Sequence, residues 1–419
     1  MEDLTFLTPE QAQSIRDEFG SPVFVYDQTT LEASADAVLA FPHAFGLTAR
    51  YAMKALPTAA VIQTLTARGL HIDASSGFEA ERALRAGVSA DKIQITAQEV
   101  PSNLMDLVKK GVLYNACSVN QLRAYGKLFP GTEVSIRVNP GLGSGHNNRT
   151  NVGGPSSSFG IWHEHLDLVE EIRAEFELTI TGMHTHVGSG GDPEVWKACA
   201  KISLDIVAQL PDVKRISLGG GFKIARMPGE TTADLQAIGE VIVENFKEFA
   251  KKDGRKLHLE VEPGTFLVAN AGAVISTVMD VVDTGNDGYQ FLKIDSGMTE
   301  ILRPSHYGAI QPITLLKADG SSPEADTAYV VAGHCCESGD ILTPSPGDPE
   351  GLEPRILPKA EVGDLLVIGG SGAYCSSMAS KNYNSFPEAS EVMIMRDATT
   401  KLIRSRQDLN QMLGNEISL

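Results

Sequence analysis

The 419-residue sequence predicts an α/β fold, a (β/α)8 barrel, followed by an all-β domain, and three observations carry this prediction. Eight short runs rich in β-forming residues recur between residues 49 and 262, each separated from the next by a stretch long enough for a helix. After residue 275 the apolar runs follow one another without helical stretches between them. The glycine run "LGGGF" lacks the GxGxxG spacing of a dinucleotide fold, which disfavours the rival open, doubly wound sheet.

The alternation of strand and helix extends over about 215 residues, which is the size and rhythm of a (β/α)8 barrel. Between the strands, "FEAERALRAGV" has apolar residues at helical spacing and closes on Gly87, and "SVNQLRAYGKLFPG" begins with a capping serine, Ser118. The strands are expected at residues 50–54, 70–75, 92–96, 112–117, 134–139, 179–187, 213–218 and 257–262.

The later apolar runs, among them "GAVISTVMDVVDT", "YQFLKID" and "GDLLVIGG", are joined by turn-rich stretches such as "PSPGDPEG". This pattern is typical of a β-sandwich or β-barrel domain. An early run, "PVFVYD", is a strand that could pair with it. We therefore expect residues 31–275 to form the barrel, and residues 1–30 with 276–419 to form the β domain.

The charge balance points to small molecules as partners. Acidic residues outnumber basic ones 53 to 35, and the net charge of -18 argues against nucleic-acid binding. The acidic start "MEDLTFLTPEQ" does not resemble a secretion signal, and no run reaches the roughly 20 apolar residues of a membrane span. A cytoplasmic protein is expected. Five cysteines without a CxxC pair suggest neither a disulfide framework nor a metal site.

Polar residues end several of the predicted barrel strands, where the chemistry of such barrels is located. Each alone has an ordinary explanation: a strand-end lysine is usually solvated, a lone histidine is usually a hydrogen-bonded core residue, and a glycine run often marks only a bend. Together they supply an amine, a guanidinium, a flat imidazole, a glycine cradle and a carboxylate, namely Lys54, Arg137 with Asn139, His186, Gly219 to Gly221, and Glu262.

Pyridoxal 5'-phosphate would use most of this set. The apolar neighbours in "ARYAMKALP" predict a poorly solvated ammonium at Lys54, and poor solvation favours the free amine that bonds to an aldehyde. A carboxylate at Glu262 could keep the ring nitrogen of the cofactor protonated, and His186 could lie flat against the ring. The backbone N–H groups of "LGGGF" could bind the phosphate, aided by the hydroxyl of Ser189.

These motifs resemble the fold-type III pyridoxal-phosphate decarboxylases, whose barrel is similar to that of alanine racemase, and within them the diaminopimelate decarboxylases. The likeness spans nearly the whole chain, in "YAMKA", "HTHVGSG", "LGGGF", "EPGTFLVANAG", "GHCCESGD" and "GAYCSSMASKNYN". The resemblance implies that Lys54 forms the Schiff base, His186 stacks on the ring and Glu262 meets the ring nitrogen. It further implies phosphate contacts from Ser189, Gly219, Gly220 and Gly221, with Tyr374 nearby.

The resemblance also implies roles for the later motifs. Cys336 would return a proton to the substrate after carbon dioxide leaves, and Glu337 would contact the distal ammonium of the substrate. Relatives form head-to-tail homodimers in which the cysteine motif enters the barrel of the partner, so that active sites are shared and a monomer is inactive.

The stretch "EILRPSHYGAI" bears on the substrate. Arg303 and Tyr307 match the "RPxxYG" motif that the family uses for a distal carboxylate, and bidentate recognition of carboxylates suits arginine. Decarboxylases of ornithine or arginine place acids there. The resemblance therefore implies decarboxylation of the diamino acid meso-2,6-diaminopimelate to L-lysine, the last step of lysine biosynthesis.

Two positions depart from the family pattern. Thr265 stands where the family reads arginine in "EPGR", and Lys223 or Arg149 would be candidates to replace that charge. Lys381 resembles a one-residue insertion before "NYN".

Several alternatives remain at this point. They are decarboxylases of carboxynorspermidine, D-ornithine, D-lysine or arginine, a racemase on the same barrel, and a non-catalytic relative that binds the cofactor. A racemase would leave "CCESGD" unexplained, and a non-catalytic relative would be expected to lose Lys54 or Cys336.

Overall fold

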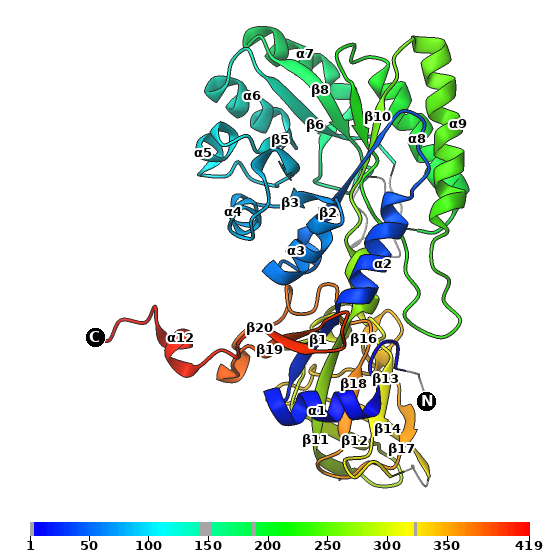
Figure 1. Ribbon diagram of the computed structural model, residues 1–419, viewed down its shortest axis with the longest axis vertical. Coiled ribbons are helices and arrows are strands. Elements are labelled where there is room, and N and C mark those ends of the chain that lie inside the picture. The colour runs from blue at the N-terminus through cyan, green and yellow to red at the C-terminus, as the bar shows by residue number, and fades with distance from the viewer. Residues whose placement is uncertain (1–3, 143–152, 187–189, 322–324) are drawn as a thin grey trace. The chain divides into compact units, whose positions relative to one another are not determined.

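The computed structural model describes residues 4–142, 153–186, 190–321 and 325–419. The chain divides into two compact units (Figure 1). The barrel unit contains residues 32–224 and 231–267, and the β unit contains residues 1–31, 225–230 and 268–419.

The barrel unit is a ring of parallel strands, as the sequence predicted. Among the described residues, eight strands pair in the cyclic order β2-β3-β4-β5-β6-β8-β9-β10, and β10 pairs with β2 to close the ring. All eight predicted strands are confirmed. They are β2 (Leu47–Ala52), β3 (His71–Ala74), β4 (Ile93–Ile95), β5 (Leu113–Ala116), β6 (Glu133–Asn139), β8 (Thr179–His184), β9 (Arg215–Ser217) and β10 (His258–Val261), with a short β7 (Ile161–Trp162) beside β6.

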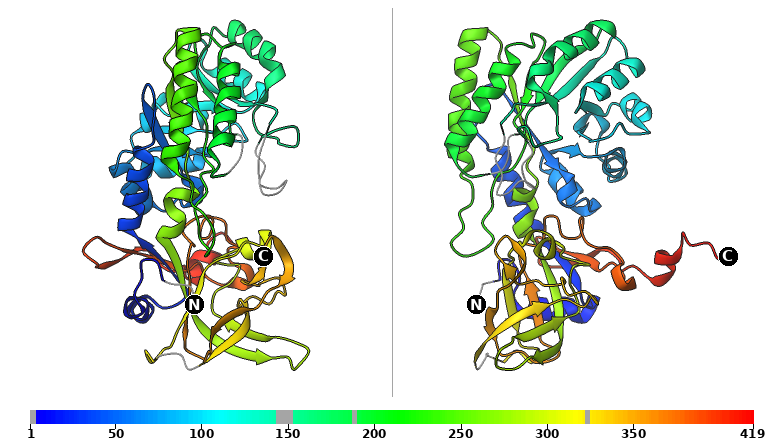
Figure 2. Two further views of the ribbon diagram at one scale, coloured as in Figure 1. Left: turned by 90° about the vertical axis from the view of Figure 1, so that its right-hand side faces the viewer. Right: turned by 180° about the vertical axis from the view of Figure 1, so that it is seen from behind.

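Helices alternate with these strands and surround them, as Figures 1 and 2 show from three sides. They are α3 (Ala59–Ala67), α4 (Gly77–Arg85), α5 (Leu104–Lys109), α6 (Val119–Leu128), α7 (Leu166–Glu175), α8 (Pro193–Val207) and α9 (Leu235–Asp253). Short 3-10 turns lie at η1 (Met53–Ala55), η2 (Ala90–Lys92) and η3 (His163–His165), and α2 (Gln28–Leu39) crosses from the β unit into the barrel unit.

The helix boundaries follow the capping residues. The Ser118 hydroxyl accepts a hydrogen bond of 3.1 Å from the N–H of Gln121 and so starts α6, as predicted. Ser76 caps α4 in the same way through the N–H of Glu79. Gly87 follows the end of α4 with φ +93°, a backbone conformation that glycine adopts without a steric penalty.

The β unit is built on one branched sheet. Its described strands are β1 (Val23–Asp27), β11 (Gly272–Asp283), β12 (Gln290–Ile294), β13 (Ile313–Leu316), β14 (Asp326–Ala332), β17 (Arg355–Pro358), β18 (Leu365–Ile368), β19 (Ser390–Ile394) and β20 (Thr400–Arg404), with a separate hairpin of β15 (Pro344–Ser345) and β16 (Asp348–Leu352). The first half of β11 pairs with β1 and β18, and its second half pairs with β12 beyond a register shift. The early strand β1 lies between β11 and β19.

The described part of the β unit also contains the helices α1 (Pro9–Phe19), α10 (Thr265–Val268), which begins in the barrel unit, α11 (Arg303–Tyr307) and α12 (Leu409–Leu413), and the 3-10 turns η4 (Ala269–Ala271) and η5 (Tyr383–Ser385). The buried face of α1 packs on the sheet through Ala12 and Ile15, against Val25 of β1 and Ile275 of β11. Within the described ranges, no helix has both the length and the hydropathy needed to cross a membrane.

Candidate active site

Lys54 lies at the carboxyl end of β2, in the turn η1. The strand ends at Ala52, so the lysine is not in the strand itself. Its neighbours Met53 and Ala55 are fully buried, whereas Lys54 is exposed. The expectation of a poorly solvated ammonium is therefore wrong for this chain, because the 3-10 turn buries the flanking residues and directs the lysine away from them.

Asp73 on β3 is a carboxyl group whose pKa is affected by the charge of Lys54. It is 4% exposed, and burial raises its pKa above the ordinary value. The positive charge of Lys54 is the largest opposing influence, followed by a hydrogen bond with Thr96. Asp73 thus provides a buried carboxyl group within electrostatic reach of the lysine.

Glu262 directly follows β10 and is 6% exposed. Its Oε1 accepts a hydrogen bond of 2.7 Å from the hydroxyl of Ser217, and its Oε2 lies 3.2 Å from Nε2 of His184. Burial raises the pKa of Glu262 to about 8, and the neighbouring Asp73 carboxylate contributes in the same direction. This carboxyl group therefore retains its proton near neutral pH and can share it with a basic atom that lies within hydrogen-bond distance.

His186 is held as a neutral ring. The backbone N–H of Gly220 donates a hydrogen bond of 3.1 Å to its Nδ1, so Nδ1 is the acceptor and the proton of the neutral ring is on Nε2. Burial lowers the pKa of His186 to about 3, and the charges of Arg137 and Lys54 contribute in the same direction. A neutral, fixed imidazole suits stacking on a cationic heteroaromatic ring.

The glycine run is shaped by its protein neighbours. A Cβ at Gly219 would overlap with the His186 ring, and a Cβ at Gly220 would overlap with the backbone carbonyl of Glu262. The N–H of Gly219 donates to the Ser217 hydroxyl at 3.1 Å. Glycines here let the loop after β9 approach two other strand ends closely, which is a requirement that the sequence did not reveal.

A second layer of polar side chains supports these groups from inside the barrel. His184 Nδ1 lies 3.1 Å from the amide nitrogen of Asn115, and the His184 ring meets the His186 ring edge to face, with centroids 6.3 Å apart. The guanidinium of Arg137 lies 4.6 Å from the centre of the Phe159 ring. Burial, the nearby Arg137 charge and His186 all lower the pKa of His184, so this ring is neutral too.

The structure thus brings Lys54, His186, Glu262 and the glycine run to the carboxyl ends of the barrel strands. Ser189 and Arg149 lie outside the described residues. Sequence reasoning missed four polar residues of the barrel interior because each lies within a predicted strand, although a polar residue in a buried strand is itself a signal; they are Asp73, Asn115, His184 and Ser217.

These residues fit pyridoxal phosphate on structural grounds. The buried Glu262 carboxyl can face a pyridine nitrogen, the neutral His186 ring can lie against the pyridine face, and the Lys54 amine can reach an aldehyde. A buried, protonated carboxyl beside neutral histidines suits a basic ring nitrogen better than it suits a metal ion, which prefers ionised oxygens.

In the β unit, Arg303 and two tyrosines lie together. Arg303 is the first residue of α11, and its guanidinium carbon lies 5.5 Å from the ring centre of Tyr307 and 5.9 Å from that of Tyr374. The helix ends at Tyr307 and is capped by Gly308, which has φ +62°. Tyr374 has φ +56°, an uncommon conformation for an aromatic residue that often marks a functional position.

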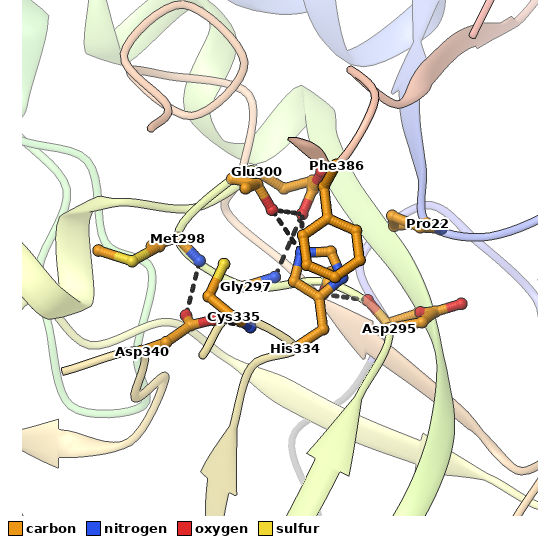
Figure 3. A network of polar contacts seen from close by, with 12 residues as sticks. Pro22, Asp295, Gly297, Met298, Glu300, His334, Cys335, Asp340 and Phe386 are labelled. Carbon is orange, nitrogen blue, oxygen red and sulfur yellow. Dashed lines mark hydrogen bonds and ion pairs between the residues drawn. The ribbon is translucent and has the colours of Figure 1, made fainter. Parts of the chain in front are cut away.

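The cysteine motif forms a turn that is fixed by Asp340 (Figure 3). The Asp340 carboxylate accepts hydrogen bonds of 2.7 Å from the N–H of Met298 and 2.9 Å from the N–H of Cys335. The next residue, Cys336, is exposed, and its N–H donates to the Asn384 side chain at 2.7 Å. Glu337 is exposed as well, so this turn presents a thiol and a carboxylate at the surface of the chain.

His334 anchors the other side of this turn. Its ring stacks on Phe386 with centroids 3.6 Å apart (Figure 3). Its Nε2 lies 2.6 Å from the Thr299 hydroxyl. Burial lowers the pKa of His334 to about 4 and raises that of Glu300 to about 7. The neutral His334 ring therefore supports the turn at physiological pH.

Replacing Gly333 with alanine is expected to displace the turn that carries Cys336, the proton donor expected from the sequence. If Cys336 has that role, activity should fall on the order of 10-fold to 100-fold, because a small displacement of a catalytic group has effects of this size. A Cβ at this position would overlap with the Asp340 carboxylate, which would then release the N–H of Cys335. Steady-state kinetics of the cofactor-loaded protein measure the effect. The matched control is Gly339→Ala, whose methyl group would make an ordinary contact of 3.5 Å with Glu337; an equal loss in both variants would contradict the role of Asp340.

Comparison with known proteins shows the family of this chain. Residues 32–269 match the family model described as pyridoxal-dependent decarboxylase, pyridoxal binding domain. The diaminopimelate decarboxylase of Streptomyces coelicolor is 36% identical over 96% of this chain and 90% of the relative, and that of Escherichia coli is 35% identical over 99% and 98%.

Solved structures give the same result. A crystal structure of diaminopimelate decarboxylase superposes with a TM-score of 0.91 at 34% identity, covering 97% of this chain and 96% of the other. The Helicobacter pylori diaminopimelate decarboxylase complexed with L-lysine matches with a TM-score of 0.82 at 26% identity, over 96% and 98% of the two chains. The chain therefore belongs to the pyridoxal-dependent decarboxylases, and within them to the diaminopimelate decarboxylases.

Proposed function

We propose that this protein decarboxylates meso-2,6-diaminopimelate to L-lysine with pyridoxal 5'-phosphate. The proposal rests on one observation: Lys54, the buried Glu262 carboxyl and the neutral His186 ring all lie at the carboxyl ends of the barrel strands. The names of the relatives in several bacteria support the same reaction.

Pyridoxal phosphate, when bound, withdraws electrons from the α-carbon and so allows the carboxylate to leave as carbon dioxide. The chain supplies the rest. With the cofactor bound, Lys54 would hold its aldehyde, Glu262 would hold a proton at the ring nitrogen, and His186 would lie against the ring face. The Gly219 to Gly221 run, with Ser189, would hold the phosphate.

In the β unit, Arg303 is the proposed partner of the distal carboxylate of the substrate, with Tyr307 and Tyr374 beside it. Arg303→Ala is expected to raise KM for diaminopimelate on the order of 100-fold, the usual cost of removing one partner of a buried charged pair. The visible absorbance of the bound cofactor should stay unchanged. A carbon dioxide assay over diaminopimelate, ornithine, lysine and arginine tests the substrate, and equal turnover of ornithine by the parent protein would refute it.

We further propose a homodimer with shared active sites. In one chain Cys336 and Glu337 are exposed, so both are available to a second subunit. Cys336 would return the proton to the substrate, and Glu337 would contact its distal ammonium. The five cysteines of the chain are free thiols, which is consistent with the reducing conditions of the cytoplasm.

Subunit mixing tests this arrangement. Lys54→Ala and Cys336→Ala homodimers are each expected to be nearly inactive, whereas a random mixture should recover about a quarter of wild-type activity, because half of the dimers then contain one intact site of two. Activity is measured after co-refolding, with size-exclusion chromatography as the control for assembly. A mixture that stays inactive although heterodimers form would rule out sites built from two chains.

A further inference from the structure

A short segment within the barrel sequence belongs to the β unit. Residues 225–230 pack with that unit, although the residues on both sides of them belong to the barrel unit. The side chain of Asn270 donates to the carbonyl of Ala225 at 2.9 Å, and the carboxylate of Glu230 accepts from the N–H groups of Arg226 and Met227 at 2.8 and 3.2 Å. The backbone around Arg226 is therefore fixed within the β unit.

The side chain of Arg226 is half-buried. Its Nε and Nη2 are buried, and neither has a hydrogen-bond partner among the described residues. The methylene stem packs against Gly370, where an added Cβ would lie 3.0 Å from Cδ of Arg226 and 3.1 Å from Oε1 of Gln311. Burying a charged group without hydrogen bonds costs free energy, so this arrangement requires a compensating function.

A second guanidinium of the same kind lies in the neighbourhood. Nε of Arg303 is also buried without a hydrogen-bond partner among the described residues. Contacts connect the two side chains: Gln311, which borders Gly370 together with the Arg226 stem, donates to Sγ of Cys375 at 3.9 Å, and the ring of the preceding residue, Tyr374, lies 5.9 Å from the Arg303 guanidinium. Burial lowers the pKa of Arg226 to about 10, and the charge of Arg303 contributes in the same direction. Burial raises the pKa of the Cys375 thiol, and the charges of Arg226 and Arg303 both oppose this rise. Two like charges with unused donors destabilise the free protein and favour an anion between them.

We propose that Arg226 and Arg303 together form the binding site for the distal carboxylate of the substrate, with Arg226 as a second specificity-determining cation. The proposal rests on the proposed function for the identity of the ligand. Two planar guanidinium groups can offer more directed N–H donors to one carboxylate than a single arginine can. The sequence pointed to Lys223 or Arg149 as the replacement for the arginine that Thr265 displaces; the structure points to Arg226.

The test compares two ligands that differ by one carboxylate, L-lysine and cadaverine, on the cofactor-loaded protein. Arg226→Met keeps the stem that packs on Gly370 and removes the charge. It is expected to weaken L-lysine binding by about 10-fold to 100-fold in isothermal titration calorimetry, the usual scale for a charged hydrogen bond to a buried group. Cadaverine binding should change by less than about 2-fold, since cadaverine has no carboxylate for the arginine pair to bind. Equal losses for both ligands, or no loss for either, would overturn the proposal.

Thermal stability separates a binding role from a structural one. If the two arginines form an anion-binding site, ligand-free Arg226→Met should melt at the same temperature as the parent or higher, because the repulsion between Arg226 and Arg303 is removed. A structural arginine would instead lower the melting temperature, and that result would count against the site. If Arg226→Met does not fold, Arg226→Lys is the variant to measure. Lysine keeps the positive charge but lacks the planar guanidinium, so L-lysine binding is expected to weaken several-fold. Unchanged binding of L-lysine would refute the proposal.

The two proposals can fail separately. A parent protein that releases no carbon dioxide from diaminopimelate would contradict the proposed function. The difference between L-lysine and cadaverine binding is an equilibrium measurement and would still report whether Arg226 recognises a carboxylate.

Discussion

Replacing Lys54 with alanine is expected to abolish turnover, with a loss of kcat at least on the order of 10^4-fold, the scale seen when a covalent catalyst is removed. The cofactor would keep its phosphate and ring contacts but lose its covalent bond to the protein. The near-violet absorbance band that disappears on borohydride treatment should be absent from the variant, and a carbon dioxide assay measures the lost activity.

Lys251→Ala is the matched control, since this lysine is an exposed residue in the last turn of α9. It should retain both the absorbance band and the activity. Wild-type activity in Lys54→Ala would refute the assignment of the lysine. If the borohydride-sensitive band persisted in Lys54→Ala, the cofactor would be bonded to another amine of the chain.

Replacing Glu262 with glutamine is expected to reduce kcat on the order of 10^2-fold to 10^4-fold, the range for loss of a positioned acid or base. The glutamine keeps the shape of the side chain and can still accept from Ser217, but it cannot exchange a proton with the ring nitrogen. Cofactor binding through Lys54 should persist, so the borohydride-sensitive band remains. A variant that retains full activity would show that the ring nitrogen does not need this carboxyl.

The same variant tests the electrostatics of the pocket through its stability. The pKa of Glu262 in the folded chain is raised from 4.5 to about 8, so the folded state binds this proton more tightly than the unfolded state. The stability contributed by this group is present below pH 4.5 and is lost as pH rises towards 8. The cofactor-free parent should therefore lose more unfolding free energy than Glu262→Gln over this window in denaturant titrations. Parallel pH profiles would contradict the raised pKa.

Local patterns predicted the frame of this protein. The alternation of strand and helix predicted all eight barrel strands, and the capping residue Ser118 predicted the start of α6. Strand-end positions pointed to Lys54, His186 and Glu262, because chain order and strand polarity determine which residues emerge at one end of a parallel barrel.

Only the tertiary structure decided what surrounds those residues. Ser217 and Glu262 are 45 residues apart and Asn115 and His184 are 69 residues apart, and barrel closure brings each pair into contact. The exposure of Lys54 depended on a single 3-10 turn.

The same division applies to the arginines. A sequence shows how many cations follow a motif but not which of them lose their solvent. Arg226 and Arg303 both have buried, unpaired nitrogen atoms in the β unit because residues 225–230 pack with that unit. Periodicity and capping are properties of neighbouring residues and can be read along the chain. Solvation and charge depend on contacts between distant segments, so only the folded structure determines them.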